Sequence, residues 1–332
     1  MNFPYADGTL GEVLGQRMDR VERELMVHLS VGDGILDPVT SHLAQAGGKR
    51  LRPALVLLTA ELGTHPDAQA VFDSAVVVEL THLASLYHDD VMDEAPKRRG
   101  VDAAQKVYGN SRAILAGDIL FARASVVISH LGPRAVELHA RTFERLCKGQ
   151  FHETAGVQPG VNMREFYLSV LSDKTASLIA ASARYGVLSS GGSEEVADAV
   201  ARFGERIGVA FQIADDVIDI VSDGATTGKT PGTDLRDGVA TMPTILLQEQ
   251  AQAGTLDDAG MRILNALRGD LSSDEALADV VGMLRAHPVM EQTQAIAEQW
   301  LARAEVELEA VPEGEVRDAL LQFGRMSVQR VA

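Results

Sequence analysis

Apolar residues recur at intervals of three and four along most of this chain, with Glu and Arg in the positions between them. The pattern is clearest over residues 10–29, 135–154 and 290–311. This spacing places the apolar side chains on one face of an α-helix, and no stretch sustains the alternation typical of a strand. Ala, Leu, Glu and Arg, which favour helices, dominate these segments. The sequence therefore predicts an all-α protein with about ten or more helices.

Clusters of glycine and proline interrupt the helical pattern, but none is rich enough to act as a linker between independent domains. They occupy residues 46–53, 129–134, 156–162, 189–193 and 222–234. A chain of 332 residues with 46% hydrophobic residues has enough apolar side chains for a sizeable core. We therefore predict a single large helical domain over residues 1–332.

The pattern Asp-Asp-x-x-Asp occurs twice, 126 residues apart, each time at the end of an apolar, helix-like segment. The two copies are Asp89, Asp90 and Asp93, and Asp215, Asp216 and Asp219. On a helix, the first and last aspartates of each copy share one face, a turn apart. Two such faces opposing each other would gather six carboxylates around one cavity, which is tolerable only with cations present. Because hard oxygen ligands select Mg²⁺, which bridges to substrate phosphates, we predict a divalent-metal site for a diphosphate.

A single motif of this kind is more often a solvated helix end than a metal site. Here the residues before each copy, 76–80 and 209–213, are apolar and mark helix faces that are expected to be buried. Charge on a buried face needs a partner, so the repetition of the motif favours metal binding.

Cationic residues gather in a glycine-led turn that enters the next predicted helix, with Lys49, Arg50 and Arg52 after two glycines. Glycines allow close backbone approach, helix N-termini attract anions, and Lys and Arg donate to phosphate. Taken singly, each cation also fits an exposed basic loop. Arg98 and Arg99 follow the first acidic motif, where they either face the same ligand or neutralise the aspartates.

Composition narrows the class of protein and its compartment. The net charge of −17 argues against nucleic-acid binding, which requires a basic surface. The single cysteine, Cys147, permits no intrachain disulfide and suits a reducing cytoplasm. The N-terminus has no signal-peptide pattern, and no uninterrupted apolar run reaches membrane-spanning length. Peripheral membrane contact stays open, because a soluble enzyme can release a lipid product.

Six motifs in fixed order carry a resemblance to a known family. They are GGKRLRP, HLASLYHDDVMD with RRG, GQ at 149–150, KT at 174–175, FQIADDVID and GKTPGTDLRDG. Together they closely resemble the trans-type (E) polyprenyl diphosphate synthases, the head-to-tail prenyltransferases, and in particular actinobacterial long-chain synthases. The motifs extend from about residue 44 to residue 243.

The resemblance implies a helical bundle of the isoprenoid synthase type with a central cavity and three Mg²⁺ ions. Asp89 and Asp93 would be ligands of two ions and Asp215 of the third, with Asp90 supporting the first site and Asp216 and Asp219 near the third ion. The catalytic residues would be Asp89, Asp90, Asp93, Lys174, Asp215 and Asp216. The isopentenyl diphosphate pocket would consist of Lys49, Arg52, His82 and Arg99. The allylic diphosphate would contact Arg98, Lys174, Thr175, Gln212 and Lys229. The family commonly has a lysine where this chain has Val239, which removes one expected diphosphate contact.

Product length is expected to depend on Ala84 and Ser85, which lie five and four residues before Asp89. Short-chain relatives carry bulky aromatic residues there, so small side chains predict an open tunnel and a medium- or long-chain product of roughly seven to ten isoprene units. The two residues otherwise serve close helix packing. A farnesyl or geranylgeranyl diphosphate synthase and a non-catalytic partner subunit are the alternative functions. A terpene cyclase and a cation-binding structural protein fit the motifs less well. The resemblance also implies a homodimer.

Overall fold

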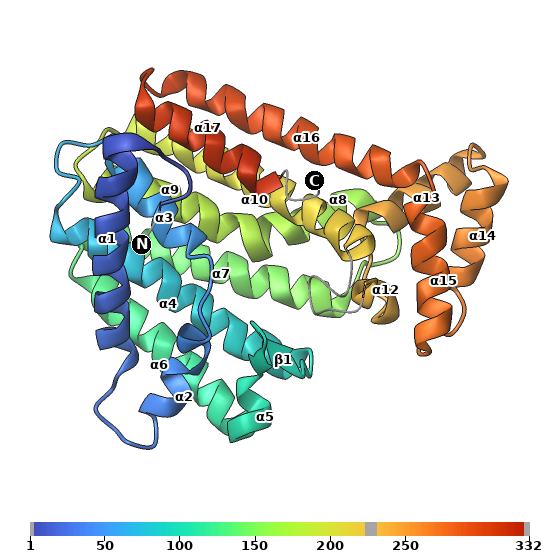
Figure 1. Cartoon of the computed structure of the whole chain (residues 1–332), viewed down its shortest axis with the longest axis horizontal. Helices are drawn as coiled ribbons and strands as arrows, with labels where there is room; N and C mark the ends of the chain where they lie inside the picture. The colour runs from blue at the N-terminus through green and yellow to red at the C-terminus, as the bar shows by residue number, and fades with distance from the viewer. Residues whose placement is uncertain (1–2, 223–230, 329–332) are drawn as a thin grey trace. The chain divides into compact units, whose positions relative to one another are not determined.

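The computed structural model describes residues 3–222 and 231–328, and these are almost entirely helical (Figure 1). The predicted all-α class is confirmed. In the described part of the chain the only strands are β1 (Lys97–Arg98) and β2 (Val101–Asp102), which pair antiparallel. The three segments with the clearest periodicity lie in α1, in α7, and in α16 with the short 3₁₀ helix η2.

The chain divides into two compact units. Unit 1 consists of Met1–Leu146, Ser177–Gly204 and Glu307–Gln322. Unit 2 consists of Cys147–Ala176, Glu205–Val306 and Phe323–Ala332. The first acidic motif belongs to unit 1 and the second to unit 2. The single domain over residues 1–332 stays a prediction.

Unit 1 is built around α4, which packs against α3, α6 and α9 (Figure 1). The elements that lie wholly in this unit are α1 (Gly8–Leu29), α2 (Asp37–Gln45), α3 (Leu51–Ala60), α4 (Gln69–Met92), β1, β2, α5 (Ala104–Tyr108), α6 (Asn110–Ser129), α9 (Ser177–Ser189) and η2 (Leu308–Ala310). Every residue from Val76 to Leu80 is buried, so α4 is covered on all sides, as expected of a core helix.

By length and composition α4 is also the one helix in the described residues that could cross a membrane. In its most apolar window, 72% of the helix is buried inside the fold. Burial of this kind is what a core helix of the unit requires.

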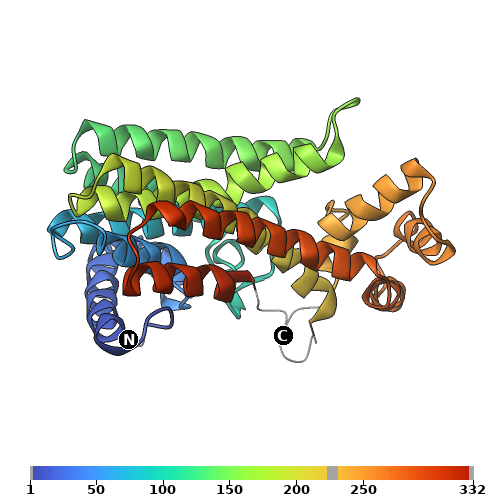
Figure 2. The same ribbon diagram turned by 90° about the horizontal axis from the view of Figure 1, so that it is seen from above.

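Unit 2 contains several short helices besides parts of longer ones, and α13 to α15 gather beside the start of α16 (Figure 2). The elements that lie wholly in this unit are α8 (Met163–Leu171), the π-helix η1 (Ser172–Ala176), α12 (Thr233–Arg236), α13 (Met242–Ala253), α14 (Asp258–Leu267) and α15 (Asp274–Arg285). Side-chain caps begin α14 and α15, where Asp257 and Ser273 accept from backbone amides in the first turn. Among the described residues, four helices belong to both units: α7 (Pro133–Ala155), α10 (Glu194–Val221), α16 (Val289–Glu307) and α17 (Glu315–Val328).

Candidate functional site

The first acidic motif closes α4, and its outer aspartates lie one turn apart, as predicted. Asp89 is in the last turn and Asp93 is the C-cap, with the Asp93 amide donating to the Asp89 carbonyl at 2.8 Å. Asp89 is half-buried and Asp93 is exposed. Two carboxylates at such a spacing can approach the same cation.

Asp90, between them, is fully buried and is directed to a different partner. Its Oδ1 accepts from Arg98 Nε at 2.7 Å and from Arg98 Nη2 at 2.6 Å. Burial raises the pKa of the Asp90 carboxyl, and the hydrogen bond and charge of Arg98 lower it again. Of the two interpretations of Arg98, the structure directly supports the second: Arg98 neutralises the buried aspartate of the motif.

Arg99 occupies the tight turn of the hairpin between β1 and β2. Arg98 pairs with Val101, so the turn consists of Arg99 and Gly100, whose φ angles are 54° and 81°. Two left-handed residues are the signature of a type I′ turn, whose twist matches that of the strands. The turn brings Arg99 to the end of α2 and the loop that follows, where Nη1 donates to Leu43 O at 2.9 Å and also to Gly47 O. The periodicity of the sequence did not predict this hairpin.

Arg52, His82 and Arg99 form a cationic cluster in unit 1. Arg52 is half-buried and its Nε has no hydrogen-bond partner. Burial and, to a smaller extent, the charge of Arg99 lower the pKa of Arg52 to about 10, against the raising effect of Glu79. Burial, then Arg52 and Arg99, hold the pKa of His82 well below its usual value. Such mutual destabilisation of positive charge is relieved by an anion, so these three residues support the predicted phosphate-binding role.

The glycine-led turn itself carries the remaining cations. Lys49 is exposed on the turn, whereas Arg50 is buried and has a φ of 48°. A Cβ at Gly48 would lie 2.8 Å from the Arg99 guanidinium carbon, so glycine is needed there for Arg99 to reach the turn. The contacts of Arg50 were not predicted from the sequence, since its partners Glu22 and Glu79 belong to α1 and α4.

The second acidic motif lies within α10, in unit 2. Gln212, Asp215 and Asp219 follow one another at intervals of three and four on this helix, as predicted. Asp215 is exposed, and Gln212 and Asp219 are half-buried. An exposed carboxylate on a helix otherwise packed into its unit is available to a ligand.

Asp216, like Asp90, is bound within the protein. Its Oδ2 accepts from the Tyr167 hydroxyl at 2.5 Å and from the Met242 amide at 2.7 Å. Burial raises the pKa of Asp216 to about 8, against the lowering effect of these two hydrogen bonds. The contacts join α10 to α8 and to the first turn of α13. In both motifs the second aspartate is thus a structural anchor, while the first and last lie on another face of the helix.

Lys174 and Thr175 lie on the π-helix η1, between α8 and α9. Two glycines make room for it: a Cβ at Gly149 of α7 would lie 2.4 Å from the Lys174 amide nitrogen, and one at Gly208 of α10 would lie 2.4 Å from Ala176 Cα. The Lys174 ammonium pairs with Glu153. π-Helical segments are frequent at functional sites, and this one explains the glycine of the Gly149–Gln150 motif. Lys229 lies outside the described residues.

The proposed chain-length residues face differing surroundings in unit 1. Ala84 is fully buried, and Ser85 is half-buried with its hydroxyl donating to His82 O at 2.8 Å. At this level α6 approaches α4 closely, because a Cβ at Gly117 would lie 3.2 Å from Ala84 O. The close-packing interpretation of Ala84 therefore has support of its own. One turn further along α6, Phe121 packs against Phe143 with ring centroids 4.2 Å apart and the ring planes tilted by 44°.

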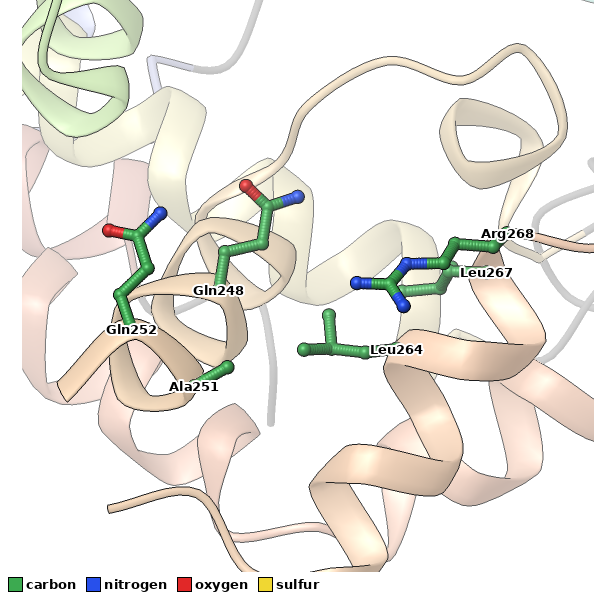
Figure 3. Close-up of a pocket in the computed structure, with 6 residues that line it drawn as sticks. All are labelled: Gln248, Ala251, Gln252, Leu264, Leu267 and Arg268. Atoms are coloured by element: carbon green, nitrogen blue, oxygen red, sulfur yellow. The ribbon is translucent and has the colours of Figure 1, made fainter. Parts of the chain in front are cut away.

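In the described residues no three side chains of His, Cys, Asp or Glu lie close enough to hold a metal ion by themselves. One physical reason is that Asp90 binds Arg98 and Asp216 binds Tyr167 and Met242, so neither joins the outer aspartates of its motif. A surface pocket of about 370 Å³ lies between α13 and α14 (Figure 3). It is lined by Gln248, Ala251, Gln252, Leu264, Leu267 and Arg268. None of these is a predicted site residue, so the pocket has no part in the candidate site.

Comparison with known proteins adds independent evidence. Residues 33–281 match the sequence model of the family described as Polyprenyl synthetase. The chain is 43% identical to the nonaprenyl diphosphate synthase of Mycobacterium tuberculosis, over 94% of this chain and 91% of that protein. It is 37% identical to the dimethylallyltranstransferase of the same organism, over 91% of this chain and 90% of that protein. The crystal structure of a geranylgeranyl pyrophosphate synthase from Corynebacterium glutamicum, complexed with calcium and isoprenyl diphosphate, superposes with a TM-score of 0.86. That protein is 39% identical, and the match covers 98% of each chain.

Proposed function

Since the chain belongs to the polyprenyl synthetase family and is a prenyltransferase of the trans-polyprenyl diphosphate synthase type, we propose that it condenses isopentenyl diphosphate with an allylic diphosphate. The observation that carries the proposal is the half-buried cluster of Arg52, His82 and Arg99 in the same unit as Asp89 and Asp93. The two diphosphate substrates account for both groups: isopentenyl diphosphate would neutralise the cations, and the allylic diphosphate would share metal ions with the carboxylates.

The donor set fits Mg²⁺. Asp89 and Asp93 offer carboxylates one turn apart, and Asp215 offers an exposed one, while the hydrogen bonds of Asp90 and Asp216 hold their helices in place. Asp89, Asp93 and Asp215 would hold the ions, three in number by family resemblance. Mg²⁺ bound there supplies Lewis-acid stabilisation of the negative charge on the leaving diphosphate.

The chain's own residues bind and orient the two substrates. Lys49, Arg52, His82 and Arg99 hold isopentenyl diphosphate, and His82 donates or accepts as a neutral imidazole because its pKa is lowered. The allylic diphosphate is contacted by Arg98, Lys174, Thr175, Gln212 and Lys229. The allylic carbon–oxygen bond breaks, the double bond of isopentenyl diphosphate forms the new carbon–carbon bond, and the departing diphosphate accepts the proton that is lost. Positioning of the two substrates supplies much of the rate enhancement.

The product is proposed to be of medium or long chain, roughly seven to ten isoprene units, on the small size of Ala84 and Ser85 and on family resemblance. The relatives named above make products of different lengths, so this assignment depends on those residues. A homodimer is part of the proposal, and exposed apolar residues on α6, Ile114, Leu115 and Val126, offer a surface for it. The proposal also places the protein in the cytoplasm, without a membrane span and in contact with the membrane only to release its product.

The test is a direct assay of the pure protein with Mg²⁺, isopentenyl diphosphate and farnesyl diphosphate. We expect release of inorganic diphosphate and, by chromatography of the dephosphorylated products, chains well beyond fifteen carbons. Absence of turnover by the lone protein, restored by a second polypeptide, would instead identify a partner subunit. Products that stop at twenty carbons would identify a short-chain synthase.

A further inference from the structure

Arg50 is one of the basic residues of the glycine-led turn, yet its guanidinium donates hydrogen bonds to groups inside unit 1. Nε donates to Glu22 Oε1 at 2.5 Å, Nη1 to Glu79 Oε1 at 2.9 Å, and Nη2 to Ala44 O at 3.2 Å. Arg50 is 7% exposed and Glu79 is 1% exposed. A buried guanidinium whose donors are engaged in this way is not available to a substrate phosphate.

The backbone of Arg50 is held in an unfavourable conformation. Its φ of 48° is left-handed, immediately before α3 begins at Leu51. For a residue with a side chain this conformation costs on the order of 1–2 kcal/mol and persists only where surrounding contacts impose it. Glu22 from α1 and Glu79 from α4 supply those contacts, and the hydrogen bond to Ala44 O ties the side chain to the end of α2.

The turn fixed in this way has a cation assigned to the substrate on either side of Arg50. Lys49 precedes Arg50, and Arg52 follows it in the first turn of α3. Arg99 reaches the same turn from the hairpin through Leu43 O and Gly47 O. Two arginines therefore bind carbonyls at the end of α2 and in the turn: Arg50 binds Ala44 O, and Arg99 binds Leu43 O and Gly47 O. Of the two, Arg50 is also anchored to carboxylates on two other helices.

We propose that Arg50, held by Glu79 and Glu22, is a positioning residue for isopentenyl diphosphate, because it fixes the turn from which Lys49 and Arg52 reach the substrate. The inference rests on the proposed function. It gives buried Glu79 a role as well: that carboxylate anchors the guanidinium and leaves the more exposed cations to the substrate.

Arg17 provides a matched control within the same unit. It also joins α1 to two carboxylates, Glu61 and Asp67, but these lie at and beyond the opposite end of α3. Lysine at either position keeps the charge and loses the forked geometry of the guanidinium. Arg17→Lys therefore reports what the loss of such a bridge does to unit 1, without acting on the turn.

The experiment measures isopentenyl diphosphate binding by calorimetry, without an allylic primer, for wild type, Arg50→Lys and Arg17→Lys. We expect Arg50→Lys to weaken binding tenfold or more and Arg17→Lys to leave it within twofold. In turnover assays Arg50→Lys should raise KM for isopentenyl diphosphate, with KM for the allylic substrate within twofold. Equal weakening by both variants, or binding by Arg50→Lys within twofold of wild type, would overturn the proposal.

Glu22→Gln is the second variant, in case Arg50→Lys does not fold. It removes the partly exposed carboxylate and leaves Glu79 and Ala44 O in place, so we expect about threefold weaker binding. Unchanged binding by a folded Glu22→Gln protein would count against the role of Arg50. A wild type that binds isopentenyl diphosphate but never turns over would refute the proposed function, while the difference between Arg50→Lys and Arg17→Lys would still support the positioning role.

Discussion

Replacing Gly149 with alanine tests whether close packing on the π-helix sets the place of Lys174. The new Cβ would lie 2.4 Å from Lys174 N, 2.8 Å from Lys174 Cα and 2.9 Å from Asp173 C. All three atoms are backbone, so neither side can yield by a rotamer change and α7 must move from η1. Overpacking of this kind costs roughly 1–3 kcal/mol. Alanine itself favours a helix by up to about 1 kcal/mol, which offsets part of that cost.

Gly282 in α15 is the matched control, because nothing lies within 4 Å of a Cβ placed there. Gly282→Ala should stabilise the protein by about 0.5–1 kcal/mol, the helix-propensity gain alone. We expect Gly149→Ala to lower the free energy of urea unfolding and to raise KM for the allylic diphosphate, with KM for isopentenyl diphosphate unchanged. If Gly149→Ala is as stable as Gly282→Ala and keeps its allylic KM, the close packing of α7 on η1 has no part in substrate binding.

Four further predictions address the metals, the product, the missing lysine and pH. Asp89→Asn or Asp215→Asn should keep the fold by circular dichroism and lower turnover by several orders of magnitude, because a neutral amide is a poor Mg²⁺ ligand; near-normal rates at saturating Mg²⁺ would exclude that residue as a ligand. Ser85→Phe should shorten the products sized by chromatography, with Ser85→Ala as control, and unchanged lengths would place the limiting residue elsewhere. Val239 is 43% exposed, so Val239→Lys should be tolerated and lower KM for the allylic diphosphate; an unaltered KM would show that the family lysine contributes nothing here. Because the folded-state pKa of His82 is below the unfolded value of about 6.5, the unfolded chain binds more protons, so stability falls as pH drops through that value. Urea unfolding at pH 5.5 and 7.5 should show a smaller loss for His82→Gln, and equal losses would refute the assignment.

The periodicity of the sequence was sufficient to predict the helices and the one-turn spacing of the outer aspartates. Asp89 and Asp93, or Asp215 and Asp219, are four residues apart, and helical geometry alone puts such pairs one turn apart. The burial of residues 76–80 followed from their composition and is confirmed. Local patterns succeed in these cases because the contacts that matter are made within one helix.

The partners of the middle aspartates, Asp90 and Asp216, could not be predicted from local sequence patterns. Asp216 binds Tyr167 and Met242, which are 49 and 26 residues away, and nothing in the motif distinguishes it from Asp215. The same holds for Arg50, whose carboxylate partners come from two other helices. Such contacts are set by tertiary packing, so one sequence read by itself contains the residues but not the pairings.

The hairpin and the π-helix were missed for a further reason. The turn of the hairpin contains Arg99 in a left-handed conformation, which glycine or asparagine usually indicates in a sequence. The π-helix η1 is five residues long and lies between two α-helices, and no glycine or proline marks it in the sequence. Both are small departures in backbone geometry that place a cation, and neither leaves a trace in hydrophobic spacing.

The central helix α4 joins the stability of unit 1 to its chemistry. The helix is buried on all sides at residues 76–80 and has Asp89 in its last turn, so the same backbone that fills the core sets the direction of the carboxylates. One inserted or deleted residue within α4 would turn its end by about 100° and shift it by about 1.5 Å. Substitutions in the core of α4 can be absorbed by neighbouring side chains, but changes in its length cannot. We therefore expect this family to tolerate changes of side-chain size along α4 better than changes in the number of residues before the first aspartate.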